Sequence, residues 1–180
     1  MKPAFAAILL ALAGGGFAAP ASAQDWTTSV SGNGLLTAEV PCSEAELAEL
    51  AARELDQQAM LGSTAPERVL CAKDGIAFLA TIKEIPVDAV EGLNFFDLIV
   101  GAIANSDDVD GDPQVGERDG RRTIVNRELD DGVLAQTMIV ELAPNRIILA
   151  NAGGPVPEGL TMEELGLMID RFMDSLTVLG

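Results

Sequence analysis

Residues 68–84, RVLCAKDGIAFLATIKE, decide which fold the sequence predicts. In the second half of this stretch, alternate positions share one face of an expected strand, and they are Ile76, Phe78, Ala80 and Ile82. Asp74-Gly75 separates this strand from a second strand-like run, and Asp-Gly readily adopts the positive φ angles of a type I′ turn. The stretch therefore predicts a β-hairpin with one face against a core.

Turn signals of the same kind recur along the chain. Asp119-Gly120 and Asp131-Gly132 are each flanked by strand-like runs. Ser31-Gly32-Asn33-Gly34 precedes LLTAEV, and Pro144-Asn145 precedes RIILANA. Together with the first turn they predict five antiparallel connections. The strand expected after Asp131-Gly132 again alternates, with one face made of Leu134, Met138, Val140 and Leu142.

Three segments carry a helical period instead. The first covers residues 45–60 and follows a capping box of Ser43 and Glu46. The second is expected to begin near Asp88, with Glu91 three residues on. The third follows a capping box of Thr161 and Glu164, with Leu160 and Leu165 at staple positions. The apolar stripes are Leu47, Leu50, Ala51, Leu55 and Ala59; Leu93, Phe96, Val100 and Ile103; and Leu165, Met168, Ile169, Phe172 and Leu176. Each stripe is expected to face a core.

The order of these elements predicts the fold class. It runs strand pair, helix, strand pair, helix, three or four strands, helix. Such an order is typical of an α+β fold, in which helices are laid on an antiparallel, hairpin-rich sheet. Residues 24–180 are enough for a sizeable core and for one domain, and we expect a single domain over that range.

Residues 1–23 have the pattern of a secretory signal peptide. Lys2 supplies the positive charge, an apolar run covers residues 4–12, and Ala21-Ser22-Ala23 fits the A-x-A cleavage site. The apolar run is far shorter than the ~20 residues of a membrane-spanning helix. We therefore expect cleavage before Gln24 and a periplasmic or secreted protein that does not span a membrane. A retained N-terminal anchor is the alternative.

The chain is strongly acidic. One of its 11 basic residues lies in the signal segment, which leaves ten basic residues against 28 acidic ones after cleavage. This charge repels phosphate backbones and anionic lipids, and it favours basic or cation-bridged partners. Nucleic acid is therefore not expected as a partner. Solubility is the simplest role of the negative charge.

Two cysteines, Cys42 and Cys71, lie in the exported part of the chain, where an even number usually indicates pairing. Both are in or beside expected strands, so neighbouring strands could bring them within bonding distance. A bridge would close a loop of 29 positions, which by chain entropy stabilises the fold by about 3.6 kcal/mol. Reactive or metal-binding cysteines are the alternative, although the spacing is not that of a zinc pair.

Three stretches resemble the PsbP-like family, the extrinsic oxygen-evolving-complex proteins and their non-photosynthetic bacterial relatives. They are the opening WTTSVSGNGLLTAEVP, the middle GIAFLATIKEIP with a helix after it, and the closing LGLMIDRFMDSLTVL. The resemblance covers most of the mature chain and implies an antiparallel sheet between helices, an α/β/α sandwich. It also implies an accessory or adaptor module, because members of that superfamily are mostly of this kind. The helix expected over residues 45–60 departs from the short loop of the family.

The residue types limit which chemistry the chain can support. The sequence has no histidine, which excludes Ser-His-Asp and Cys-His catalysis and histidine-containing metal sites. Ser175 has no lysine nearby in sequence to act as a base and is interpreted as a helix-end hydroxyl. A carboxylate pair for glycoside chemistry stays open, although the chain offers one tryptophan and no tyrosine as sugar platforms.

Residues 106–117, SDDVDGDPQVGE, match the spacing of an EF-hand calcium loop. The ligand positions would be Ser106, Asp108, Asp110, Asp112, Gln114 and Glu117, with Gly111 at the sharp turn. Glu117 should begin an exit helix, but a turn and a strand-like run follow it. We therefore interpret the stretch as a solvated acidic loop, with calcium binding as the alternative.

Two classes of function follow. The favoured hypothesis is an exported accessory or binding module without an evident catalytic site or cofactor, which binds an envelope protein or small ligand. The alternatives are a carboxylate-based periplasmic hydrolase and a calcium-binding protein that uses residues 106–117. Two carboxylates that converge in a deep pocket would favour the hydrolase.

Export and pairing can be tested together by intact mass. The protein isolated from the periplasm is expected to start at Gln24 and to lack two hydrogens, because Cys42 and Cys71 are bonded. Alkylation under denaturing, non-reducing conditions is the matching control. Two freely alkylated thiols would show that the bridge does not form.

Overall fold

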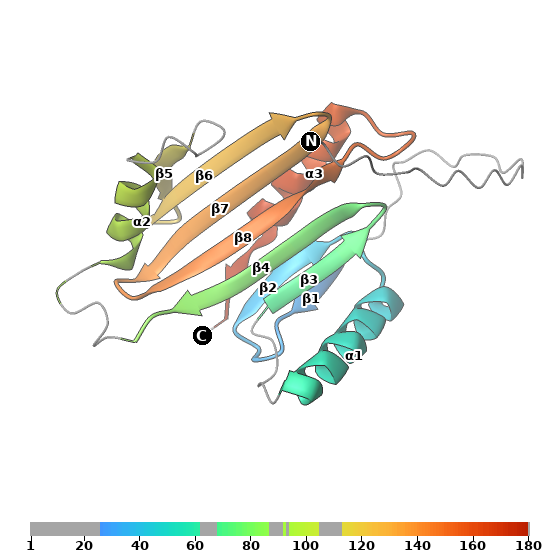
Figure 1. Cartoon of the computed structure of the whole chain (residues 1–180), viewed down its shortest axis with the longest axis horizontal. Coiled ribbons are helices and arrows are strands. Elements are labelled where there is room, and N and C mark those ends of the chain that lie inside the picture. The colour runs from blue at the N-terminus through green and yellow to red at the C-terminus, as the bar shows by residue number, and fades with distance from the viewer. Residues whose placement is uncertain (1–25, 62–67, 87–91, 93, 105–112, 180) are drawn as a thin grey trace, which may run out of the picture.

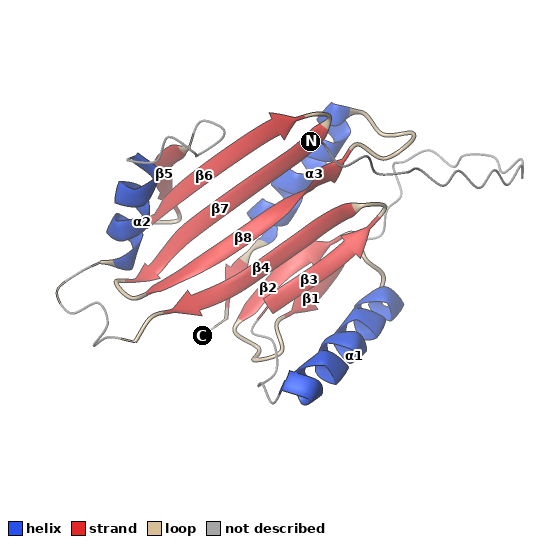
Figure 2. Ribbon diagram, viewed as in Figure 1, coloured by secondary structure: helices blue, strands red, loops and turns tan. Residues whose placement is uncertain are grey.

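The computed structural model describes residues 26–61, 68–86, 92, 94–104 and 113–179. The helices and strands follow one another as in Figures 1 and 2. The elements are β1 (Thr27–Val30), β2 (Leu36–Val40), α1 (Glu44–Leu61), β3 (Arg68–Lys73), β4 (Ile76–Glu84), α2 (Phe95–Ala104), β5 (Gln114–Arg118), β6 (Arg121–Asp130), β7 (Val133–Ala143), β8 (Arg146–Pro155), α3 (Met162–Ser175) and β9 (Thr177–Val178). This order confirms the α+β prediction and adds one short strand, β9, that the sequence analysis missed.

The described strands form two antiparallel sheets rather than the one that was expected. The large sheet has the order β3-β4-β8-β7-β6-β5, and the small sheet has the order β1-β2-β9. All paired strands run antiparallel. The hairpin of β1 and β2 belongs to the small sheet, because β2 pairs with the C-terminal β9 and not with any strand of the large sheet.

The predicted turns are confirmed. Lys73 pairs with Ile76 across Asp74-Gly75, so the hairpin of β3 and β4 has a two-residue loop. The equivalent loops at Asp119-Gly120 and Asp131-Gly132 connect β5 to β6 and β6 to β7. In all three turns the aspartate and the glycine have positive φ, between 44° and 82°. These are the angles that a type I′ turn requires, and the right-handed twist of the flanking strands favours that turn.

Gly153 and Gly154 let β8 lie close to β7 and to the hairpin of β3 and β4. A Cβ placed on Gly154 would lie 2.4 Å from the carbonyl oxygen of Gly75, and one on Gly153 would lie 2.5 Å from that of Leu134. No side chain fits at such distances from backbone atoms. The glycines therefore allow β8 to pass between β4 and β7 at the end of the large sheet.

The main core lies on one face of the large sheet, where α3 and the small sheet cover it. Phe172 of α3 packs against Phe78 of β4 with ring centroids 5.4 Å apart, and the Trp26 ring lies 6.4 Å from the Phe78 ring. The alternating residues that the sequence predicted to be inside, Ile76, Phe78, Ala80 and Ile82, are all buried. Such edge-to-face aromatic pairs add about 0.5–1.5 kcal/mol beyond the area they bury.

The last helix, α3, is held at both ends. At its start, Thr161 and Glu164 form the predicted capping box, and the hydrogen bonds from Thr161 lower the pKa of Glu164. At its end, the Ser175 hydroxyl donates to Phe172 O and accepts from Glu39 N, both at 2.8 Å. Ser175 therefore has a structural role, because its hydroxyl joins α3 to a part of the β2 edge that β9 does not pair with.

The other face of the large sheet is covered at one end by α2. Phe96 is fully buried there against Ile124, Ile139 and Ile147. The helix begins at Phe95 and not near Asp88, because the Asn94 side chain caps it by accepting from Phe96 N at 2.8 Å. The prediction of its start was therefore wrong, and the expected capping residues at positions 88 and 91 lie outside the described residues.

The first helix, α1, does not cover a sheet. Its predicted capping box is confirmed, since Ser43 N donates to Glu46 and Glu46 N donates to Ser43 Oγ. The expected contact of its apolar stripe with a core is confirmed for Leu47, which is half-buried and packs against the main core, and is wrong for Ala51, which is exposed; Leu50 is half-buried. An apolar stripe in the sequence shows that a helix has an apolar face, but it does not show that another element packs against that face.

Cys42 and Cys71 form the predicted disulfide, with their Cα atoms 6.0 Å apart. They do not lie on neighbouring strands of one sheet. Cys42 follows β2 of the small sheet, whereas Cys71 belongs to β3 of the large sheet, and both are fully buried. The bridge therefore ties the two sheets together next to the start of α1.

The docking of α3 can be tested by cutting back its central aromatic residue. Phe172→Ala is expected to lower the free energy of unfolding by about 3–5 kcal/mol, because Phe172 is fully buried against Phe78. Leu167→Ala is the matched control on the same helix, where Leu167 is 62% exposed, and should change it by less than about 0.5 kcal/mol. Equal small losses in urea denaturation would show that α3 does not pack as described.

Candidate binding sites

The structure describes only two of the six predicted calcium ligands. Ser106, Asp108, Asp110 and Asp112 lie outside the described residues, whereas Gln114 and Glu117 both lie on β5. Side chains three apart on a strand point to opposite faces, so these two do not converge on one point. Where an EF-hand would continue into a helix, Glu117 instead pairs with Arg122 of β6. Within the described ranges, no group of three or more acidic or cysteine side chains could hold a metal ion.

An opening lies between α1 and the edges of both sheets, and we name it the α1 cleft. Its volume is about 420 Å³. Its walls are β1 (Thr27, Thr28, Ser29, Val30 and the following Gly32), α1 (Glu44, Leu47, Ala48, Leu50 and Ala51) and β3 (Arg68 and Leu70). The apolar residues that the sequence assigned to a core therefore face this opening. A volume of this size falls in the range of about 300–1,000 Å³ that is usual for ligand pockets.

Two interactions hold the first turns of α1 beside β3. The Cys42–Cys71 bridge joins β3 to the residue directly before the capping box. Glu46 receives hydrogen bonds from Ser43 and lies 3.6 Å from the Lys73 ammonium. The pKa of Glu46 is lowered, first by the Ser43 backbone N–H and hydroxyl and then by the Lys73 charge. The N-terminal end of α1, which forms one wall of the α1 cleft, is therefore held against β3.

The α1 cleft offers three kinds of contact to a ligand. β1 and β3 are the end strands of their sheets, so each has one edge without a partner strand in the described topology. Leu47 and Leu50 give an apolar wall, and Val30 at its rim is 54% exposed. Glu44 gives a charge, and it forms no ion pair with any residue that the structure describes. Backbone edges and apolar side chains together suit an extended polypeptide, and the cation Arg68 lines the cleft as well as Glu44.

A second opening lies between β5 and the end of α3, and we name it the β5 slot. Its volume is about 250 Å³. It is lined by Gln114, Val115, Gly116, Glu117 and Arg118 of β5, Thr123 and Val125 of β6, Gln136 and Met138 of β7, and Asp170, Met173 and Asp174 of α3. Most of its surface is apolar, and a few polar groups stand at defined positions.

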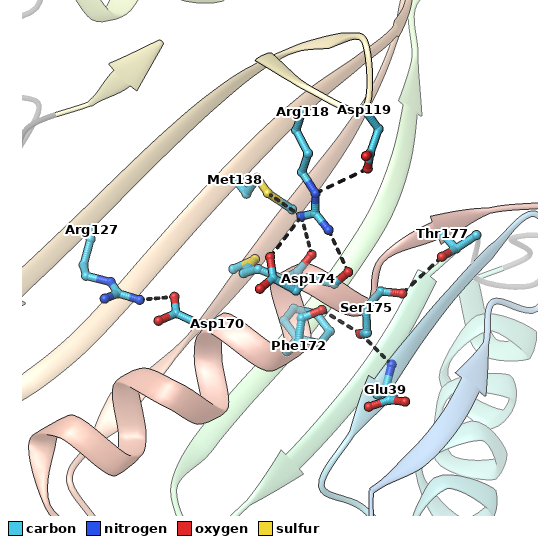
Figure 3. A network of polar contacts seen from close by, with 11 residues as sticks. Glu39, Arg118, Asp119, Arg127, Met138, Asp170, Phe172, Asp174, Ser175 and Thr177 are labelled. Atoms are coloured by element: carbon cyan, nitrogen blue, oxygen red, sulfur yellow. Dashed lines mark hydrogen bonds and ion pairs between the residues drawn. The ribbon is translucent and has the colours of Figure 1, made fainter. Parts of the chain in front are cut away.

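Arg118 links β5 to α3 at the end of this slot, as Figure 3 shows. Its guanidinium donates to Met173 O and Asp174 O, both at 2.7 Å, and lies 3.7 Å from the Asp174 carboxylate. These carbonyls belong to the last turn of α3, which has no helical partners for them. Arg118 thus caps the helix and keeps the exposed strand β5 next to it.

Arg127 and Gln136 shape the opposite side of the β5 slot. Arg127 forms an ion pair with Asp170, which Figure 3 shows, and its Nε donates to Gln136 Oε1 at 2.6 Å. Because Nε is only a donor, the oxygen of the Gln136 amide must face it. Gln136 is 7% exposed as a whole residue, and Arg127 is its hydrogen-bond partner.

Sequence analysis did not find either opening. For the α1 cleft a signal was present, since the stripe of α1 is apolar, but the pattern carries no information on what faces it. For the β5 slot the sequence carries no signal, because Arg118 and Gln136 lie on different strands and meet α3 only after folding. The predicted disulfide, by contrast, needed only the even number of cysteines.

Comparisons with known proteins add a distant likeness. No family model and no curated protein matches the sequence. Among solved structures, PA94 from Pseudomonas aeruginosa, a protein of unknown function, aligns over 79% of this chain and 90% of its own at 11% identity, with a TM-score of 0.38. A likeness at this level carries no argument. The PsbP-like resemblance therefore stays a prediction. No helix within the described ranges is long and apolar enough to cross a membrane.

We predict that residues 106–117 hold no specific calcium site. Calcium titrated into the mature protein at physiological salt should show at most weak association through the acidic surface, because the loop runs into a strand instead of an exit helix. Isothermal titration calorimetry of wild type beside Asp110→Ala is the measurement. A tight one-to-one isotherm that Asp110→Ala abolishes would contradict the prediction.

Proposed function

We propose that this protein is an exported binding module without catalytic activity, and that it binds an extended segment of a partner protein in the α1 cleft. The observation that carries the proposal is that Leu47, Leu50 and Ala51 of α1 face an open cleft beside two strand edges. Buried disulfides are typical of oxidising compartments, and the signal pattern of residues 1–23 agrees with export.

The strand edges favour an extended occupant. A segment laid along β1 or β3 would satisfy backbone N–H and C=O groups on that edge, and its alternate side chains would point toward α1. Leu47 and Leu50 would then contact apolar residues of the segment. Natural proteins usually protect such edges from strand addition, so an edge that opens into a cleft favours strand addition by a partner.

The charges favour a basic occupant. Glu44 and Arg68 both line the cleft, so the preference for a basic occupant comes from the acidic chain as a whole. The mature chain carries ten basic against 28 acidic residues, so its field attracts cationic partners from outside the cleft and speeds their association. A lysine or arginine of the segment is expected to lie against Glu44.

The cleft can be tested with a photo-crosslinking amino acid at Ala51 in the exported protein. The expected product is a covalent adduct with a single segment of a partner that contains Lys or Arg, identified by mass spectrometry. A synthetic peptide of that segment should then bind the purified protein. Leu50→Lys should weaken this binding about tenfold or more, because it places a charge on the apolar wall.

The matched control places the same crosslinker at Leu167, which is exposed on α3 away from the cleft. Leu50→Lys itself lies on a half-buried position and should keep the fold, as circular dichroism can show. Equal labelling from positions 51 and 167, or a peptide that binds wild type and Leu50→Lys alike, would show that the α1 cleft is not the binding site.

A further inference from the structure

We propose a second site, separate from the α1 cleft, that binds a small carboxylate with an apolar chain. It is an opening of about 270 Å³ between β9, the face of the large sheet that α3 covers, and the turn from β5 to β6. We name it the β9 pocket, and Figure 3 shows Arg118, Asp119 and Thr177 of its walls. None of its lining residues lines the α1 cleft, so the two proposals can fail independently.

The β9 pocket exists because α3 ends before it has covered the whole sheet. The chain continues from α3 as β9, a strand of two residues that pairs only with β2. Beyond the helix end, Met138, Val140 and Ile148 of the large sheet form an apolar floor. Leu176 and Val178 are half-buried and give one apolar wall. The floor and this wall therefore suit a hydrocarbon group.

Two arginines stand on the other side of the pocket. Arg118 and Arg121 flank the Asp119-Gly120 turn and lie directly opposite each other in the register of β5 and β6. Their side chains therefore leave the same face of the sheet, the face from which Arg118 reaches α3. Like charges that are directly opposite on two strands destabilise the pair unless other groups compensate them.

The protein compensates one of these two charges. Arg118 lies 3.7 Å from the carboxylates of Asp119 and Asp174, and it donates to the carbonyls of Met173 and Asp174. The two hydrogen bonds also offset the negative end of the α3 dipole, which would otherwise repel an anion. The Arg121 side chain forms no ion pair and no hydrogen bond with any residue that the structure describes. Arg121 is therefore left to bind an anion.

The guanidinium of Arg121 selects a carboxylate, because its planar fork can donate two parallel hydrogen bonds to the two oxygens. The nearby carboxylates of Asp119 and Asp174 are paired with Arg118. Their side chains are 89% and 78% exposed, so water screens their repulsion of a ligand.

The size of the pocket limits the apolar chain to a few carbon atoms. Its volume of about 270 Å³ lies below the range of about 300–1,000 Å³ in which drug-sized ligands bind. A carboxylate with such a chain is the chemistry of a short-chain fatty acid, and also of an apolar residue at the C-terminus of a peptide.

The test is an NMR titration of the ¹⁵N-labelled mature protein with 4-methylpentanoate. So few ligand atoms should give a dissociation constant of about 1 mM. The amide signals of residues 118–121 and 176–178 should shift, together with the Nε–H signal of Arg121. 4-Methylpentanol has the same chain without the charge, and acetate has the charge without the chain. Both should bind about tenfold more weakly or worse.

One further probe distinguishes the sources of the carboxylate. The dipeptide acetyl-Ala-Leu presents the same branched chain and a carboxylate on a peptide C-terminus. Tighter binding of this dipeptide than of 4-methylpentanoate would identify a protein C-terminus as the ligand, whereas weaker binding would identify a free short-chain acid.

Two substitutions of opposite effect probe the charges. Arg121→Gln should weaken 4-methylpentanoate about tenfold and leave 4-methylpentanol unchanged, because only the acid uses the guanidinium. Asp119→Asn should tighten the acid about twofold, because it removes a repulsive but largely screened charge. Asparagine also tolerates the positive φ of this turn position, so the hairpin is kept.

Lys83→Gln is the matched control. It removes the same charge from the chain, but Lys83 is exposed on β4 and does not line the β9 pocket, so this variant should bind the acid as wild type does. Equal binding of acid and alcohol, unchanged acid binding by Arg121→Gln, or no shifts around the pocket at about 20 mM acid would each overturn the proposal.

Discussion

Phe172 packs edge-on against Phe78, and the arrangement of the other elements depends on that contact. Both rings are fully buried, one on α3 and the other on the central part of β4. With α3 in place on the large sheet, its C-terminal turn reaches the small sheet through Ser175 and β5 through Arg118. A single buried aromatic pair therefore positions three parts of the chain that are far apart in sequence.

The disulfide has a comparable role close to this aromatic pair, because Cys71 is the cross-strand neighbour of Phe78. It joins the end of β2 to β3 directly before α1 begins, so the helix starts beside an edge of the large sheet and not over a face. This geometry explains why an apolar helix face is left beside an opening. The same bridge limits how far the two sheets can move apart at that point.

Both candidate sites lie beside end strands, β1 and β3 in one case and β5 in the other. This placement has a physical cause. In the centre of the large sheet, each strand is paired on both sides and α3 fills one face, whereas at its ends the backbone edges and neighbouring helices enclose space that the chain does not fill. Binding functions are expected at such places, because a rigid sheet holds the groups around the space without having to rearrange.

Local features of the sequence determined much of this fold. Asp-Gly pairs fixed three hairpins, because few other residues adopt positive φ at both positions of a turn. Two capping boxes set where α1 and α3 begin, since their hydrogen bonds are made within four residues. Alternation placed Phe78 and its neighbours inside. The start of α2 was missed because Asn94 is one of several residues that could cap it, and its hydrogen bond to Glu141 of β7 exists only in the folded chain.

Only the tertiary structure decided how these elements meet. Alternation and helical period show that an element has an apolar face, but the partner of that face is set by contacts between residues distant in sequence. For this reason the split into two sheets, the opening beside Leu50 and the slot around Gln136 could not be predicted, whereas the class of the fold and the pairing of Cys42 with Cys71 could. The sequence by itself determined the elements and their turns; the packing of α3 and the bridge before α1 determined where the surface is left open.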